Sequence, residues 1–598
     1  MRGYALSEVT IDQEADSAVD ESRPVDKKRR FFRHEWTIAT VGSVLLAIIM
    51  VWLLPPYANR LISGVVKPAT IADPTGTISG DSGDPTAQAW IVGWNGHALR
   101  HGLRGLWDTN AFYPDRYGLA LTDSLFGYAP AGLIGDGVTA AVLRYNVLFV
   151  LTFALAFLGG YMLLRQLGAH PAAAALAGAA LAYAPWRYGH VGHLNIMSTG
   201  GITLALAMLA RGHGWSLSRG YRSERVRPGW AIAGWVVAAW QVSLGFGVGL
   251  AFVYLLAFAF LCAVVGWLVT GRPRLSRRLV LGDLLGGLFL VAVTGYFAYA
   301  YQQVREIYPL VNRSWDYVAV FSPTPRSLLV APQFSLPWGS VHTDARALLG
   351  EAANEKALLC GYALYLLAFT GLFVSVWSLR QRLFLLAGTV VGVLFTLGTN
   401  GPLYQLLHSY VPGFDGSRTP GRLILWPTIF LAVLAAGLVT ELARLAREAT
   451  LPQWSAIAVR VVTIPPLLLV LAEGTPNIDH PDVPPPPAAM AMAQAPIMVL
   501  PSDEGIDNNV LLWSTAGFPA LVNGAASYTP PNHQAIRDIM HTFPSQPSVD
   551  RLRRLGVRSV VVLGDRLSGS PYQAVLQTPP PAGVTRVYVG SDVLFTIS

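Results

Sequence analysis

Long apolar stretches alternate with short polar connections along most of the chain. One apolar run covers 37–54. Ten more, of roughly 17 to 25 residues each, are centred near Phe153, Leu176, Leu204, Val237, Phe258, Leu290, Leu367, Val391, Leu434 and Pro466. A helix needs about 20 apolar residues to cross the hydrocarbon core of a bilayer. The pattern therefore predicts an α-helical polytopic membrane protein with about 11 transmembrane helices.

Basic residues occur on alternate connections between these runs. They lie before the first run, at Arg165, and in 211–227, 271–278, 380–382 and 444–447. Because Lys and Arg favour cytoplasmic loops, this side is predicted to be cytoplasmic, together with the polar N-terminal tail 1–35. The first run has no small-residue cleavage site and is predicted to be an uncleaved signal anchor. The connections 55–140 and 302–356 are predicted to be extracytoplasmic.

Composition agrees with a membrane protein. The 598 residues are 53% hydrophobic and 13% charged, and the mean hydropathy is +0.43. The net charge of +8 is explained by short basic clusters between apolar runs, so no nucleic-acid partner is expected. Lysine is found at four positions and the remaining basic residues are arginine, which is typical of a GC-rich bacterial genome. The predicted location is the bacterial plasma membrane. Cys262 and Cys360 both lie in apolar runs, where packing is the expected role.

The C-terminal part has a different pattern. After the predicted transmembrane domain 36–472, a proline-rich linker covers 473–490 and includes "PDVPPPP". The remainder, 491–598, contains the strand-like segments "APIMVLP", "FPALVNG", "VRSVVVLG" and "TRVYVGSDVLFTIS", with helical periodicity at 533–542 and 548–555. It is predicted to be a small extracytoplasmic α/β domain.

The first predicted outer segment, 55–140, contains two acids, Asp81 and Asp84, in "SGDSGDPTAQAWIVGWNGHALRHG" (79–102). Asp84 before Pro85 predicts a helix N-cap, and Gly102 predicts the C′ position of the same helix. Apolar residues recur on one face, so the helix is expected to lie in the membrane interface. Capping explains Asp84 as well as catalysis does, and the two roles are compatible.

Further polar side chains are predicted on the same outer side. Asp115 and Asp123 lie in "NAFYPDRYGLALTDSLFGYA", where an ion pair with Arg116 and a second N-cap are the simpler explanations. The turn "APWRYGHVGHLN" (184–195) carries three more candidates, Arg187, His190 and His193. Two histidines three residues apart favour interfacial hydrogen bonding over metal binding, since no H-E-x-x-H pattern is present. No metal site is predicted.

Arginines near two predicted outer connections are candidates for anion binding. Arg418 and Arg422 precede a span in "LGTNGPLYQLLHSYVPGFDGSRTPGRLILW" (397–426). Guanidinium forks suit phosphate oxygens, although both side chains are also placed to reach lipid headgroups. Arg313 lies among aromatic residues in the loop 302–356, a combination that suits sugar or headgroup contact or a packed surface loop.

These segments resemble the GT-C superfamily of multi-span glycosyltransferases, and within it the YfhO-like branch of bacterial membrane proteins. The resemblance is carried by "SGDSGDP", "FYPDRYGLALTDSLFGYAP", "RYGHVGHLN" and "PLYQLLHSYVPGFDGSRTPGR", and by "ALVNGAASYTPP" and "LRRLGVRSVVVL" in the tail. It implies an inverting sugar transfer from a polyprenyl-phosphate donor to an envelope glycan, lipid or protein acceptor, beside membrane lipid. The base would be Asp84 or, second, Asp81.

The sequence departs from the adjacent acids that many members of this superfamily show, because two residues separate Asp81 from Asp84. No certain cofactor is implied, and a divalent cation remains possible. Two other classes stay open from the residues. One is a transporter or lipid flippase, for which Asp283 is one of few acids near membrane depth. The other is a non-catalytic envelope assembly protein.

Overall fold

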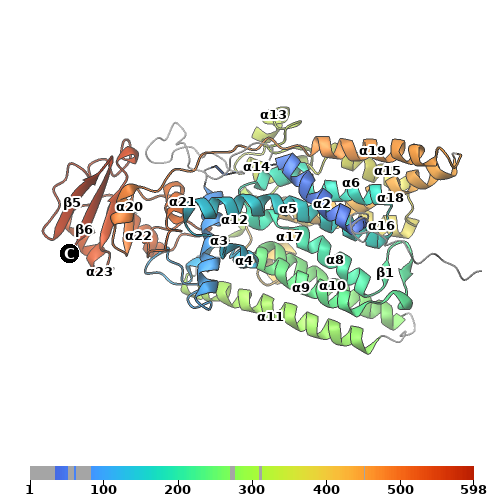
Figure 1. Cartoon of the computed structure of the whole chain (residues 1–598), viewed down its shortest axis with the longest axis horizontal. Coiled ribbons are helices and arrows are strands. Elements are labelled where there is room, and N and C mark those ends of the chain that lie inside the picture. Colours follow the sequence, from blue (N-terminus) through green and yellow to red (C-terminus); the bar gives the residue numbers. More distant parts are fainter. Residues whose placement is uncertain (1–33, 52–59, 62–82, 270–275, 309–312, 450) are drawn as a thin grey trace, which may run out of the picture.

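The computed structural model describes residues 34–51, 60–61, 83–269, 276–308, 313–449 and 451–598. A long helical bundle forms most of the molecule, and a small sheet with its own helices lies beyond one end of it (Figure 1). A helix occupies each of the eleven predicted positions. They are α2 (Glu35–Val51), α5 (Gly137–Leu167), α6 (Pro171–Tyr183), α8 (Gly200–Gly212), α9 (Pro228–Leu244), α10 (Phe246–Val269), α11 (Arg277–Ile307), α15 (Tyr362–Phe373), α16 (Leu379–Thr396), α18 (Leu425–Glu448) and α19 (Ser455–Glu473).

Seven helical stretches of the described residues are long and apolar enough to cross a membrane, and they contain α5, α8, α10, α11, α16, α18 and α19. The other four helices are shorter: α2 and α9 have 17 residues, α6 has 13 and α15 has 12. About 20 residues are needed to span the hydrocarbon core without help from neighbouring segments. The chain is a multi-pass membrane protein by these criteria, while eleven spans stay a prediction.

The bundle has central and peripheral helices. In the most apolar windows of α5 and α18, 72% of the residues are buried, against 17% in α10, α11 and α19 and 11% in α16. Large apolar side chains project from the peripheral helices, among them Phe258, Phe384 and Leu468. Such extensive apolar surface is costly in water, so these faces are suited to lipid.

Three of the connections predicted to be cytoplasmic meet at one end of the bundle. Arg165, at the end of α5, forms an ion pair with Glu35 at a distance of 2.5 Å. Gln381, in the first turn of α16, donates a hydrogen bond of 2.6 Å to the carbonyl of Leu217. That carbonyl lies in the turn of a hairpin formed by β1 (Trp215–Ser216) and β2 (Gly220–Tyr221). Arg165 and the segments 211–227 and 380–382 therefore share one end of the bundle, and the orientation of this end toward the cytoplasm stays a prediction.

The opposite end of the bundle is built from short helices and irregular segments. These are α3 (Asp84–Arg100), α4 (Ala129–Gly132), α7 (Leu194–Met197), α12 (Trp315–Val320), α13 (Thr343–Ala347), α14 (Ala353–Lys356) and α17 (Tyr404–Tyr410). The predicted loop 302–356 is therefore largely folded, where the structure describes it. This end faces the C-terminal sheet (Figure 1).

Helix α3 forms where it was predicted, but its environment is different. Gly102 has φ +68° and follows the C-cap, as expected for C′. The predicted polar face is buried: Gln88 accepts from the backbone N–H of Leu194, and Asn95 donates to the carbonyl of Ser124. The helix is therefore enclosed by protein, because distant segments provide hydrogen-bond partners for these side chains, while its position at the membrane interface stays a prediction.

Helices α3 and α4 touch backbone to backbone at Gly96 and Gly132. A Cβ atom added to Gly96 would lie 2.1 Å from the carbonyl carbon and oxygen of Gly132. We expect Gly96→Ala to lower the thermal unfolding midpoint markedly, since overpacking of this kind costs about 1–3 kcal/mol or more. The matched control is Gly287→Ala in α11, where a Cβ would meet nothing within 4 Å. Equal midpoints for the two variants in detergent would contradict the close contact.

The C-terminal sheet has four strands in the order β3-β4-β6-β5. β3 (Ile497–Leu500) and β4 (Ser559–Val562) are parallel, and β6 (Asp592–Ile597) is antiparallel to β4 and to β5 (Val584–Val589). The sheet is accompanied by α20 (Ala488–Met492), α21 (Glu504–Trp513), α22 (Pro531–Met540) and α23 (Gln546–Arg554). α22 and α23 fall on the two predicted helical segments.

Three of the four predicted strand segments contain strands, and "FPALVNG" does not. Leu521 makes only an isolated bridge to Ile497. Two residues later, the Asn523 side chain accepts from the N–H of Val499 and donates to its carbonyl. A side chain therefore takes the place of the backbone pairing that would have extended the sheet.

Candidate active site

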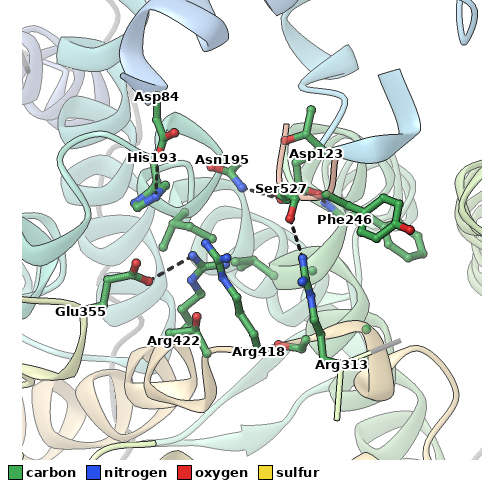
Figure 2. Close-up of a pocket in the computed structure, with 18 of the residues that line it drawn as sticks. Asp84, Asp123, His193, Asn195, Phe246, Arg313, Glu355, Arg418, Arg422 and Ser527 are labelled. Atoms are coloured by element: carbon green, nitrogen blue, oxygen red, sulfur yellow. Dashed lines mark hydrogen bonds and ion pairs between the residues drawn. The ribbon is translucent and has the colours of Figure 1, made fainter. Parts of the chain in front are cut away.

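A cavity of about 1240 Å³ lies at the outer end of the bundle, next to the C-terminal sheet unit. Segments that are far apart in the sequence contribute to its lining, including the start of α3, the turn before α7, the first turns of α10, α14 and the segment before α18. Figure 2 shows polar side chains pointing into it from several sides. The predicted site residues that line it are Asp84, Asp123, His193, Arg313, Arg418 and Arg422.

Asp84 pairs with a histidine. Its Oδ2 lies 2.9 Å from Nε2 of His193, and its side chain is 48% exposed. Asp84 is the first residue of α3 and not its N-cap, so the capping prediction is wrong. The cap is Gly83, whose carbonyl accepts from both the backbone N–H and the hydroxyl of Thr86. The Asp84 carboxylate lines the cavity and points to His193 (Figure 2).

Asp123 has a structural role in the cavity wall. Its two carboxylate oxygens accept hydrogen bonds from the side chain of Asn195 and from the backbone N–H of Phe246 at 2.9 Å. Phe246 is the first residue of α10, where N–H groups have no partner within the helix. Asp123 therefore caps α10 from another part of the chain, whereas the sequence predicted a local N-cap.

Two arginines share one tyrosine on the opposite wall. Arg418 donates to the hydroxyl of Tyr317 at 3.1 Å, and the guanidinium of Arg313 lies 5.1 Å from the centre of the same ring. Arg313 also donates to the carbonyl of Ser527 at 2.6 Å. Burial and the neighbouring charge of Arg418 both lower the pKa of Arg313. Within the described part of the chain, neither guanidinium has a carboxylate within 4 Å.

The other arginines of the cavity are already paired. Arg422 lies 3.3 Å from Glu355, and Arg305 forms an ion pair with Asp415. The net positive charge available to an anion therefore comes mainly from Arg313 and Arg418. Figure 2 shows the side chains of Arg418 and Arg422 reaching into the space between the Asp84–His193 pair and Asp123.

Glu355 is a site residue that sequence reasoning missed. It lies in α14 and its side chain is 16% exposed. Burial opposes its ionisation, but the nearby charges, chiefly that of Arg422, outweigh burial and lower the pKa of Glu355 to about 2. The carboxylate therefore stays charged at all physiological pH values. The available sequence signal was an acid close before an apolar run, which is common at membrane surfaces.

Three predicted site residues do not line the cavity. Arg187 is fully buried and donates to Thr199 and to the carbonyl of Met197. His190 lies behind His193, and burial lowers its pKa to about 3, so it is neutral. Both side chains are buried in the protein and do not line the cavity.

Asp115 is the third of these residues, and it contacts the C-terminal unit. It accepts a hydrogen bond of 3.0 Å from Asn532, and burial raises its pKa. The ion pair suggested with Arg116 does not form, because Arg116 lies nearest to Asp108. Asp81 falls outside the described residues, so its position is not part of this site description.

The described residues contain no cluster of three or more His, Cys, Asp and Glu side chains able to hold a metal ion. His190 and His193 do not share a ligand, since Nε2 of His193 faces Asp84. Among the described residues, the possible cation ligands at the start of α3 are Asp84 and His193, whereas a tightly bound divalent cation prefers several oxygen ligands.

Removal of the Glu355 charge gives the first test of the cavity electrostatics. We expect Glu355→Gln to bind a short polyprenyl phosphate, farnesyl phosphate, about 3- to 10-fold more tightly, because Arg422 loses its internal partner. The matched control is Glu351→Gln, four residues earlier and exposed. Isothermal titration of both variants in nanodiscs measures the difference. Weaker binding by Glu355→Gln would instead give Glu355 the task of holding Arg422 in place.

Comparisons with known proteins leave the family open. No family model matches, and no curated protein matches by sequence. Among solved structures, the chain is similar to the arabinofuranosyltransferase AftD from Mycobacteria, with a TM-score of 0.48 and 16% identity over 94% of this chain and 41% of that one. It is also similar to ArnT from Cupriavidus metallidurans in the apo state, with a TM-score of 0.44, 15% identity and 94% and 97% coverage.

The chain spans about two fifths of the length of AftD, since the alignment covers 41% of that protein. TM-scores below 0.5 carry no argument on activity. We therefore base the function on the cavity and its side chains.

Proposed function

We propose that this protein is an integral membrane glycosyltransferase of the GT-C type, which moves a sugar from a polyprenyl-phosphate donor to an acceptor on the outer side of the membrane. The observation that carries the proposal is one cavity that holds a carboxylate paired with histidine, together with two guanidinium groups that have no carboxylate partner among the described residues. The YfhO-like resemblance and a bacterial plasma membrane location belong to the same proposal.

Two helices with largely exposed apolar surfaces, α10 and α11, contribute to the cavity wall. Its lining includes Val248 and Ala251 of α10 and Ala298 of α11. In both helices only 17% of the most apolar window is buried inside the protein. A polyprenyl chain can therefore lie against α10 and α11 while its phosphate reaches the arginines. This arrangement suits a lipid-linked donor better than a water-soluble nucleotide sugar.

The proposed reaction is a single displacement. The acceptor hydroxyl attacks the anomeric carbon, Asp84 takes its proton, and the bond between that carbon and the phosphate oxygen breaks. The departing phosphate changes from a diester with one negative charge to a monoester with two. Arg418 and Arg313 stabilise this added charge in the transition state. The product has inverted configuration because attack and departure occur on opposite faces.

Asp84 suits the base role better than three other carboxylates of the cavity. Glu355 has a pKa of about 2, which makes it a poor proton acceptor. Asp123 caps α10 with both oxygens engaged, and Asp415 is paired with Arg305. Asp81 remains the second candidate for the base. Arg422 remains a proposed phosphate ligand, with an expected contribution reduced by Glu355.

The transporter alternative receives no support from Asp283. This acid accepts from Trp235 and lies 2.9 Å from His213, so it forms a closed pair between helices. Such a pair explains an acid near membrane depth without a conduction pathway.

The test uses the whole protein in nanodiscs with a polyprenyl-phosphate-sugar extract from bacterial membranes. Mass spectrometry should detect free polyprenyl phosphate that accumulates with the wild-type protein and not with Asp84→Asn. A transporter or an assembly protein would leave the lipid-linked sugars intact. The glycosyltransferase would be rejected if the lipid-linked sugars stayed intact with the wild-type protein, in a preparation that binds farnesyl phosphate to saturation.

A further inference from the structure

One wall of the cavity comes from the C-terminal sheet unit. The segment Ala525–Thr529 lines the cavity together with Glu504 and Asn508 of α21. Its contact with the membrane domain is direct, because the carbonyl of Ser527 accepts the hydrogen bond from Arg313. Figure 2 shows Ser527 beside Arg313 at the edge of the cavity. The proposed base and the proposed phosphate ligands all come from other segments of the chain.

A buried charge network lies directly behind the segment. Asp507 is fully buried and accepts hydrogen bonds from the side chain of Asn523 at 2.7 Å and from Arg537 at 2.7 Å. It also accepts from the backbone N–H of Gly524 at 3.3 Å, while Arg537 donates to the carbonyl of Gly524 at 3.0 Å. Both polar backbone atoms of Gly524 are thereby fixed immediately before the segment enters the cavity.

Packing restrains the same point from the other side. A Cβ atom on Gly524 would lie 2.5 Å from the ring of Phe112, so only glycine fits against this ring. Asn523 is anchored to Val499 of β3 by two hydrogen bonds. The segment therefore projects from a rigid base, as expected for a group that must be placed accurately against a ligand.

The chemistry of this wall differs from that of the arginine wall. It contains Ser527, Tyr528 and Thr529 of this segment, and Glu504 and Asn508 of α21. The Tyr528 ring lies 6.1 Å from that of Tyr308. Hydroxyl groups and one carboxylate beside an aromatic ring suit a ligand with many hydroxyl groups.

We propose that Ala525–Thr529 forms the acceptor subsite, that the acceptor is a carbohydrate, and that Asp507 is the positioning residue that holds this wall. The inference rests on the proposed function and narrows its acceptor to glycans and glycolipids. A carbohydrate bound here would lie against Tyr528 and present a hydroxyl group to the space between the arginines and Asp84.

The experiment measures two ligands separately on the full-length protein in nanodiscs. A panel of methyl glycosides of common hexoses and pentoses is screened by saturation-transfer NMR, and farnesyl phosphate is titrated by calorimetry. We expect Tyr528→Ala to weaken the best glycoside about tenfold and to leave farnesyl phosphate affinity unchanged. Tyr528→Phe, which keeps the ring, should restore most of the glycoside binding.

Asp507→Asn should also weaken the glycoside selectively, because Gly524 loses its charged partner. The matched control for Tyr528→Ala is Tyr588→Ala, which removes a tyrosine ring that is 60% exposed on the sheet and does not line the cavity. Farnesyl phosphate binding without any glycoside binding, or Tyr528→Ala binding glycosides as wild type does, would overturn the carbohydrate subsite and leave the glycosyltransferase in place. If the wild-type protein did not bind farnesyl phosphate, the polyprenyl-phosphate donor would be rejected, and with it the proposed function.

Discussion

Asp84→Asn is expected to reduce turnover roughly 10²- to 10⁴-fold, the range that a positioned general base contributes. An amide cannot accept the proton of the acceptor hydroxyl. It can still accept the hydrogen bond from His193, which lies 2.9 Å from Asp84. The initial rate of polyprenyl phosphate release measures the effect, and farnesyl phosphate affinity should remain at the wild-type value.

Asp344→Asn is the matched control, since it makes the same chemical change at an exposed residue of α13 outside the cavity lining. Its turnover should equal that of the wild type. Wild-type turnover in both Asp84→Asn and Asp81→Asn would remove the base from the first outer segment. Asp123 would then be the next residue to examine.

Arg418→Ala is expected to weaken farnesyl phosphate binding about 10- to 100-fold, because hydrogen bonds to charged groups contribute about 1.5–3 kcal/mol each. Arg313→Ala should have an effect of similar size, since both guanidinium groups flank Tyr317. Arg422→Ala should have a smaller effect, because Arg422 is already paired with Glu355. Calorimetry with purified variants gives all three values.

Arg326→Ala serves as the control for the change in net charge, because Arg326 is exposed and does not line the cavity. It should bind farnesyl phosphate as the wild type does. If Arg418→Ala and Arg313→Ala also bound at wild-type strength, the phosphate would have to lie elsewhere and headgroup contact would be the better explanation of these arginines.

The helix positions were predictable because each depends on a local apolar run. The environment of α3 was not, because its polar side chains find partners far away in the sequence. Gln88 contacts the backbone of Leu194, and Asn95 contacts that of Ser124. Periodicity shows which face is polar, but it cannot show that another segment covers that face.

The candidate site was also predictable only in part, since some of its residues gain their role from contacts with distant segments. Asp84, Arg418 and Arg422 were predicted on one side of the membrane, and the structure brings them to one cavity. Glu355 was missed because its significance depends on Arg422, a residue 67 positions later that lies 3.3 Å away. Arg187 and Asp115 were predicted as site residues because they are charged. In the structure each of them forms hydrogen bonds that hold the fold together, Arg187 with Thr199 and Asp115 with Asn532.

The pairing of the first outer segment with the C-terminal unit determines when the cavity is completed during synthesis. Asn110 donates to the carbonyl of Pro519, 409 residues later, and its own carbonyl accepts from Leu521. A nascent chain on the ribosome therefore carries Asp84 and the arginines well before the wall at 525–529 exists. The complete cavity can therefore form only after the segment 525–529 has been synthesised, when the helices that precede it have already been made.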